Sequence, residues 1–183
     1  PAAPVWNSAA TAERDSTEAL QLEEIPLTTG RLLSDFHAVK DDTFMVDLPS
    51  GVYDVTISQG DRTRVRDEMA IFLEDVEVDT VMAQAGEIVT NTYRVEVTDD
   101  QLTLRLQDQG GATGRSAINA LVITPVGASD GFSTLTLDFG SLTSPLQPGA
   151  IQVHGDSQAV SFGWLDGGFN IVERVPDVSN LQL

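Results

Sequence analysis

Apolar and polar residues alternate along most of this chain, and this period of two is the feature that most limits its fold. Phe44, Val46 and Leu48 alternate with polar residues, and residues 102–106 (LTLRL) repeat the pattern. Successive side chains of a β-strand point to opposite faces, so this spacing predicts strands with one buried face. Short strands separated by turns rich in Gly, Asp and Pro are typical of an antiparallel β-sandwich. The sequence therefore predicts an all-β fold.

Three segments carry more specific predictions. The alternation continues across a turn at residues 49–51, which predicts a β-hairpin over residues 44–57. Residues 117–123 are apolar almost throughout, which predicts one strand buried on both faces. Residues 9–24 are the best helical candidate, but their apolar spacing is poor, so we expect at most a turn or two of helix there.

The charge of the chain disfavours nucleic acids and anionic lipids as partners. Lys and Arg number 10 against 28 Asp and Glu, which gives a formal net charge of -18. Such a surface repels the phosphates of nucleic acids and anionic lipids.

No stretch approaches the roughly 18 apolar residues of a membrane span, so we expect no membrane insertion. The absence of cysteine excludes disulfides and thiolate zinc sites, but it does not fix the compartment.

The sequence offers little for catalysis. His37 and His154 are far apart and lie in no metal-ligand spacing, and we interpret His37 as a strand-edge residue rather than a base. The Gly-rich residues 109–114 contain no Lys, which favours a turn over a phosphate-binding loop. Spacing alone does not exclude a pair of carboxylates for glycoside hydrolysis, but no insertion that would form a pocket accompanies them. We therefore expect no enzymatic activity.

Several consecutive segments resemble a known module. FMVDLPSGVYDVTIS, MAIFLEDVEVDTV, TNTYRVEVTDDQLTLRL and INALVI follow one another as strands do in the malectin-like, galactose-binding-type β-sandwich of bacterial extracellular multidomain proteins. The resemblance covers about residues 5–124. It implies a jelly-roll sandwich in a bacterial protein at the cell surface or outside the cell.

The phrase that opens a module of that family comes last in this chain. A segment like FDFG normally stands first, whereas here LDFG occupies residues 137–140, followed by SPLQPG and FGW. The two ends, VWNSAATAERD and GWLDGGFNIVERV, also echo each other about 160 residues apart, which indicates a tandem repeat cut out of phase. We predict the main part of a sandwich that lacks its usual first strand at residues 1–124. A linker at 125–134 and a segment at 135–183 that completes this or the next sandwich follow it.

Three arrangements are open for residues 135–183. They could fold back to complete a circularly permuted sandwich, begin a second module, or insert into the next copy by strand donation. We favour a permuted or swapped sandwich, because an open apolar sheet edge must be covered. A homo-oligomer or head-to-tail neighbours are then the expected partners. The candidate strand-exchange and interface residues are Leu135, Leu137, Phe139 and Trp164.

A glycan is the other candidate partner. Sandwich modules bind sugars with an aromatic platform flanked by polar groups. Trp6 and Trp164 are the candidate platforms, and Arg14 with Asp15 is the candidate polar pair. The competing interpretation, which we favour, is that both Trp side chains fill the core or an interface.

Ca²⁺ is the one metal that the sequence brings into consideration. Backbone carbonyls of a turn can add oxygen ligands to those of its carboxylates, but no EF-hand loop is present. Acidic turn residues facing water are the preferred interpretation, so no metal is assigned. The residues concerned are Asp41, Asp42, Asp99, Asp100 and Asp130.

The sequence thus favours a non-catalytic, extracellular structural or adhesive repeat module. It would be a building block of a bacterial surface fibre, layer or long repeat protein, joined through shared or donated strands. The alternative is a carbohydrate-binding module associated with a polysaccharide-active enzyme.

Overall fold

A computed structural model describes residues 35–127, 132–154 and 162–173, and within these ranges all regular structure is β-strand. The predicted all-β fold is confirmed, and none of the described residues forms a helix that could cross a membrane. The strands are β1 (Asp35–Val39), β2 (Asp41–Asp47), β3 (Gly51–Asp61), β4 (Arg66–Leu73), β5 (Val76–Ala83), β6 (Glu87–Val97), β7 (Gln101–Asp108), β8 (Ser116–Ile118), β9 (Ala120–Pro125), β10 (Leu135–Phe139), β11 (Ile151–Val153), β12 (Phe162–Trp164) and β13 (Phe169–Glu173).

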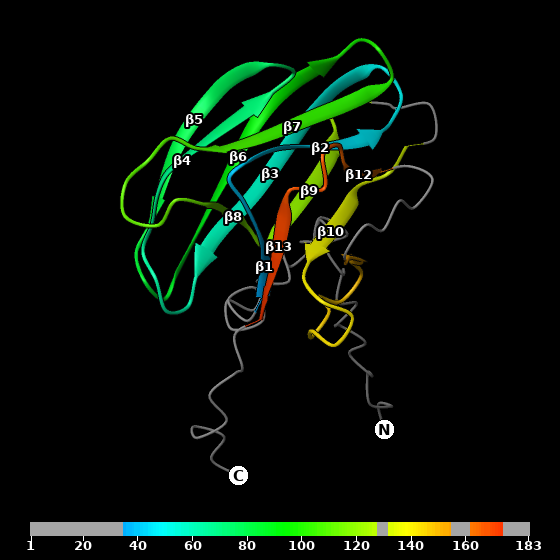
Figure 1. The fold of residues 1–183 in the computed structure, drawn as a ribbon. Coiled ribbons are helices and arrows are strands. Elements are labelled where there is room, and N and C mark those ends of the chain that lie inside the picture. The colour runs from blue at the N-terminus through cyan, green and yellow to red at the C-terminus, as the bar shows by residue number, and fades with distance from the viewer. Residues whose placement is uncertain (1–34, 128–131, 155–161, 174–183) are drawn as a thin grey trace, which may run out of the picture.

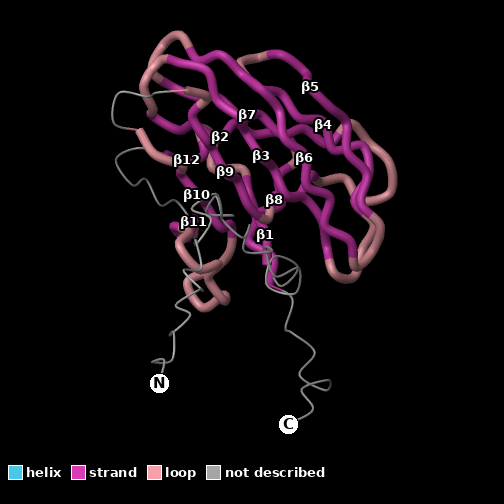
Figure 2. The backbone as a smooth tube through the Cα atoms, turned by 180° about the vertical axis from the view of Figure 1, so that it is seen from behind, coloured by secondary structure: helices cyan, strands magenta, loops and turns pink. Residues whose placement is uncertain are grey.

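The strands form two large sheets and a small one (Figure 1). The first sheet has the order β12-β2-β7-β4-β5, and the second has the order β11-β10-β9-β3-β6. Figure 2 shows β9, β3 and β6 side by side from behind. The small sheet has the order β13-β1-β8, and β13 and β1 lie side by side towards the lower end of the sandwich in Figure 1. Every described pair of strands is antiparallel except β10 with β11, so the sandwich is predominantly antiparallel, as predicted.

The core lies between the two large sheets, where the period-two residues meet. In β2, Phe44 and Val46 are buried, and their register partners Leu104 and Leu102 in β7 are buried beside them. Residues between them in the chain are at least partly exposed. Full burial of one such side chain stabilises the fold by about 1.5–3 kcal/mol, so this alternation is the main force that orders the strands.

The predicted hairpin over residues 44–57 is wrong in its pairing. Both halves are strands, but β2 belongs to the first sheet and β3 to the second. The turn at residues 49–51 therefore carries the chain from one layer to the other, and the Tyr53 hydroxyl donates a hydrogen bond to the Pro49 carbonyl at this turn. Alternation determines which face of a strand is buried but not which strand lies beside it, so the sequence pattern fits both arrangements.

The single buried strand predicted for residues 117–123 is also wrong, because the chain changes sheet at Asn119. Residues before it form β8 of the small sheet, and residues after it form β9 of the second sheet. Asn119 is fully buried, its backbone N–H donates to Ser58 O at 2.9 Å, and its side-chain amide donates to Asp35 O at 3.0 Å. A buried polar side chain thus supports the change of sheet.

The described strands after residue 135 belong to the same sandwich. β10 pairs with β9, β12 pairs with β2, and β13 pairs with β1. Leu137, Phe139 and Trp164 are buried within their own chain, and Leu135 is half-buried. In this structure these strands therefore complete the sheets in cis. The helical candidate at residues 9–24 lies outside the described residues.

Candidate functional site

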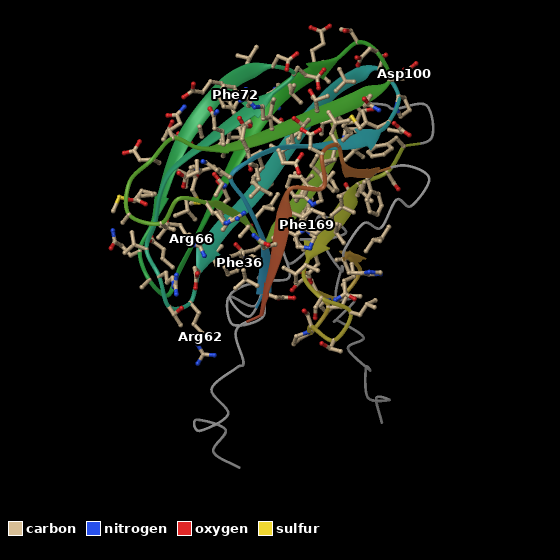
Figure 3. The ribbon with its side chains drawn as sticks, in the orientation of Figure 1. Phe36, Arg62, Arg66, Phe72, Asp100 and Phe169 are labelled. Atoms are coloured by element: carbon tan, nitrogen blue, oxygen red, sulfur yellow. The ribbon has the colours of Figure 1, made fainter. Side chains whose placement is uncertain are left out.

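The outer side of the first sheet carries an aromatic ring among charged side chains. The register aligns Thr43 on β2, Arg105 on β7, Phe72 on β4 and Glu77 on β5 in one row. None of the four side chains is buried, and Figure 3 labels Phe72 on this part of the sandwich. We call this surface the Arg105 face and define it by Asp41, Thr43, Phe72, Glu77, Arg105 and Gln107.

The guanidinium of Arg105 is held from two sides. Its Cζ lies 5.0 Å from the centroid of the Phe72 ring, within the range of a cation–π interaction. Its Nε and Nη2 donate to the two oxygens of Asp41, each at 2.7 Å. The Gln107 side-chain amide donates to the same carboxylate at 3.0 Å. Because the ring and the carboxylate both orient the planar guanidinium, the site is organised before any ligand arrives.

This ion pair is charged at neutral pH and remains accessible. The hydrogen bond from Arg105 lowers the pKa of Asp41, and the hydrogen bond to Asp41 raises the pKa of Arg105. The two side chains are 39% and 43% exposed for Arg105 and Asp41. Exposed pairs contribute only about 0–1 kcal/mol to stability, so the fold does not depend on this one.

Two polar groups of the Arg105 face are left for a ligand. Nη1 of Arg105 and Oε1 of Gln107 make no hydrogen bond to any other described residue. They present a donor and an acceptor beside the half-buried Phe72 ring. A ligand that combines hydroxyl groups with an apolar surface fits this set, because hydroxyls both donate and accept while the ring packs on C–H groups.

Further carboxylates lie on and around the Arg105 face, and three of them are fixed by an uncharged donor. Such contacts hold a carboxylate in place without neutralising it. The contacts are Gln101 Nε2 to Asp47 Oδ1 at 2.9 Å, Thr103 Oγ1 to Glu74 Oε1 at 3.1 Å, and Thr80 Oγ1 to Glu77 Oε1 at 3.2 Å.

The outer side of the second sheet provides a comparison. Arg94 on β6 donates from Nε and Nη2 to Asp54 on β3 at 2.9 and 3.1 Å, which is the same paired geometry. Next to it, Thr56 and Thr92 share a hydrogen bond of 2.8 Å. Among the described residues no aromatic ring lies under Arg94, so this face has the ion pair without the platform.

The predicted ligand-binding residues are only partly described. Trp6, Arg14 and Asp15 lie outside the described residues. Trp164 on β12 is 7% exposed and packs edge-on against Phe44, with ring centroids 5.2 Å apart. A ring covered in this way offers no free face to a sugar, so its position is that of a core residue.

The prediction that His37 is a strand-edge residue is wrong. It lies in β1, the central strand of the small sheet, and is fully buried. Its Nδ1 accepts the indole N–H of Trp164 at 3.0 Å, and its Nε2 lies 3.3 Å from Gly140 O. Nε2 therefore carries the proton and donates it to this carbonyl. Burial lowers the pKa of His37 to about 4, so the ring is a neutral link between strands.

The acidic residues considered for calcium are engaged elsewhere or not described. Asp41 holds Arg105, the Asp42 carboxylate accepts the backbone N–H of Gly168 at 2.8 Å, and Asp100 accepts from Ser50. Asp130 lies outside the described residues. Within the ranges that the structure describes, no three His, Asp or Glu side chains gather as a metal site would require.

One nucleophile pattern was missed by the sequence analysis. Residues 127–131 read Gly-Ala-Ser-Asp-Gly, which matches the Gly-x-Ser-x-Gly of a hydrolase elbow. An elbow joins a strand to a helix, whereas here the flanking strands β9 and β10 are antiparallel neighbours in one sheet. The residues of the pattern after Gly127 lie outside the described ranges. The pattern therefore stands in the wrong structural context for an elbow.

The Arg105 face was missed as well, although one signal for it was visible. The alternation of LTLRL predicts that Arg105 points outward. Asp41 and Phe72 lie 64 and 33 positions away in the chain, and only the register of β2, β7 and β4 brings them together. A scan for residues close in sequence cannot find such a site.

The comparisons with known proteins agree with the fold. The model of the family described as beta-agarase/YXIM esterase-like, galactose-binding domain-like matches residues 24–124. Searches of curated proteins and of solved structures gave no match. The matched range includes strands β1–β8 and nearly all of β9, and so every residue of the Arg105 face.

Proposed function

Because the chain belongs to the beta-agarase/YXIM esterase-like, galactose-binding domain-like family, we propose that it acts as a non-catalytic carbohydrate-binding module. The observation that supports this most directly is the Arg105 face, where an oriented guanidinium and a carboxylate flank the Phe72 ring. This proposal replaces the structural or adhesive repeat role as the preferred function, because the family is described as galactose-binding domain-like.

The mode of binding follows from the geometry of the face. A pyranose ring would pack its C–H groups against the part of the Phe72 ring that the Arg105 guanidinium leaves exposed. Its hydroxyls would accept a hydrogen bond from Nη1 of Arg105 and donate one to Oε1 of Gln107. Since Asp41 already orients Arg105, the ligand would not have to order that side chain on binding.

The family description mentions a beta-agarase and an esterase, and this bears on the wider role. We propose that the module holds a polysaccharide-active enzyme close to its substrate. Such polymers are found outside cells, so the proposed location is extracellular or at the bacterial cell surface. We further propose that the module is related to malectin-like modules and that it comes from a protein with tandem repeats.

We also propose that the chain order is a circular permutation of the module. β10, β12 and β13 lie outside the matched residues 24–124, yet each pairs with a strand inside that range. The segment that normally comes first in the module would then come last in this chain, while keeping its usual position in the sheet. Strand donation to a neighbour is not required for this arrangement.

Two matched variants test the binding function. Arg105→Ala and Arg94→Ala each remove an exposed arginine from a two-oxygen pair with Asp, but only Arg105 lies over a ring. Calorimetric titration with a β-1,4-galactan oligosaccharide should show at least a tenfold loss of affinity for Arg105→Ala, or about 1.4 kcal/mol. Arg94→Ala should stay within twofold of the wild type. Equal losses for both variants would reject the site, and no binding by the wild type would reject galactan binding.

A further inference from the structure

The Arg105 face is strongly unbalanced in charge. One guanidinium stands among carboxylates, and Lys40 directly precedes Asp41 in the sequence, just before β2. The Lys40 carbonyl accepts the backbone N–H of Asp108. Lys40 therefore lies at one end of the face, next to the acidic residue Asp108. The five carboxylates on and around the face are Asp41, Asp47, Glu74, Asp75 and Glu77.

Four of these five carboxylates form no salt bridge with any described residue. Asp41 pairs with Arg105, which also attracts Asp75, while Asp47, Glu74 and Glu77 are held by side chains of Gln or Thr. Uncharged donors position a carboxylate but do not cancel its field. Together with the net charge of -18, this gives the face a negative potential that extends over about 8 Å at physiological ionic strength.

The arrangement treats charged and uncharged sugars differently. A chain with carboxylate or sulfate groups would bring like charges against the surrounding carboxylates, which opposes binding. An uncharged chain avoids this repulsion, and its hydroxyls can still donate to the carboxylate oxygens.

We infer that the Arg105 face selects uncharged glycan chains and rejects acidic ones. This inference rests on the proposed function and adds to it the chemical class of the ligand. Specificity here is a difference between two affinities, and the repulsive carboxylates set that difference.

The test compares one backbone in two charge states. A β-1,4-galactan oligosaccharide and the same chain oxidised at C6 to carboxylate differ only in the acidic group. The unmodified chain should bind the full chain of this protein at least tenfold more tightly at about 0.01 M salt, where the Debye length is about 30 Å. The ratio should shrink as salt is raised to about 1 M. Equal or tighter binding of the oxidised chain overturns the inference, whereas binding of neither chain rejects galactan binding by the proposed module.

Two variants separate the effect of the carboxylates at the Arg105 face from the effect of the net charge of the whole protein. Asp47→Asn with Glu77→Gln removes two of the surrounding charges, and this should narrow the preference for the unmodified chain by at least threefold. Glu96→Gln removes an exposed charge from β6 of the second sheet and should leave the ratio unchanged. If Glu96→Gln narrows the ratio as much, the net charge of the protein and not the Arg105 face sets the selectivity, and the inference is wrong.

Discussion

The guanidinium of Arg105 lies 5.0 Å from the ring centroid of Phe72 while Asp41 holds its other edge. Arg66 makes the same two kinds of contact, with its guanidinium 4.9 Å from the Phe36 ring and 2.8 Å from Asp61, but it is only 5% exposed. Figure 3 labels both rings and shows that they are well separated. The buried set joins strands, whereas the exposed set is the proposed ligand site.

The shape of the Arg105 side chain is predicted to matter more than its charge. Arg105→Lys keeps the positive charge but loses the planar fork that contacts both oxygens of Asp41. We expect affinity for a galactan oligosaccharide to fall by about fivefold to tenfold in calorimetric titration. The same change at Arg94 is the control and should have no effect. Full affinity in Arg105→Lys would show that the charge alone suffices.

The buried imidazole of His37 predicts a loss of stability in mild acid. Its pKa falls from 6.5 in the unfolded chain to about 4 in the folded one, so only the unfolded chain takes up the proton between these values. The free energy of unfolding should therefore decrease as pH falls from about 6.5 to 4, by up to about 1.4 kcal/mol per pH unit. Carboxylates with lowered pKa, such as Asp41 and Asp67, lose their stabilisation only at lower pH.

Urea unfolding at a series of pH values measures this effect. His37→Gln keeps a donor and an acceptor but cannot titrate, so its stability should be lower at pH 7 and nearly flat between pH 6.5 and 4.5. A wild-type slope that is unchanged in His37→Gln would assign the acid sensitivity to other groups.

The indole N–H of Trp164 is predicted to contribute to stability through its acceptor, Nδ1 of His37. Trp164→Phe keeps an aromatic ring in the core but removes this donor and leaves a buried acceptor unpaired. We expect a loss of about 1–3 kcal/mol in the free energy of unfolding. An unchanged unfolding midpoint would contradict the hydrogen bond.

The burial of Trp164 also predicts a spectroscopic result. In a Trp6→Phe background Trp164 is the only tryptophan, and its emission should be that of a buried indole. Addition of a galactan oligosaccharide should leave this emission unchanged. A glycan-dependent shift would instead support the platform role that the sequence analysis considered for Trp164.

Two glycines of β3 differ in how much space surrounds them. A Cβ at Gly60 would lie 2.0 Å from the backbone oxygen of Glu87, whereas at Gly51 the nearest atom, in the Tyr53 ring, is 3.6 Å away. Gly60→Ala must therefore displace β6, and we expect it to cost about 1–3 kcal/mol or more. Gly51→Ala is the matched control and should change stability by less than about 1 kcal/mol in thermal unfolding. Equal effects would contradict the close approach of β3 and β6.

The fold class could be predicted from the sequence because alternation is a local property. Residues 44–48 and 102–106 show their buried faces directly in the order of their side chains. Strand partners could not be predicted, since residues 44–57 have the same alternation whether the turn stays in one sheet or crosses to the other. The change of sheet at Asn119 could not be predicted either. Asn119 is the one polar residue in an apolar run, and such a run also fits a single buried strand.

The site could be predicted only in part. An outward Arg105 follows from alternation, but its position over Phe72 depends on the register between β7 and β4. The polar pair predicted from the sequence, Arg14 with Asp15, is adjacent in the chain. In the structure the pair is formed across strands, by Arg105 and Asp41.

The most direct test of the account is an NMR titration of the labelled protein with a β-1,4-galactan oligosaccharide, following the side-chain Nε–H signals of Arg105 and Arg94. The account predicts a saturable shift for Arg105, with accompanying shifts of the Phe72 and Gln107 amides, and no change for Arg94. Saturable shifts confined to Arg94 or to residues away from the first sheet would contradict it.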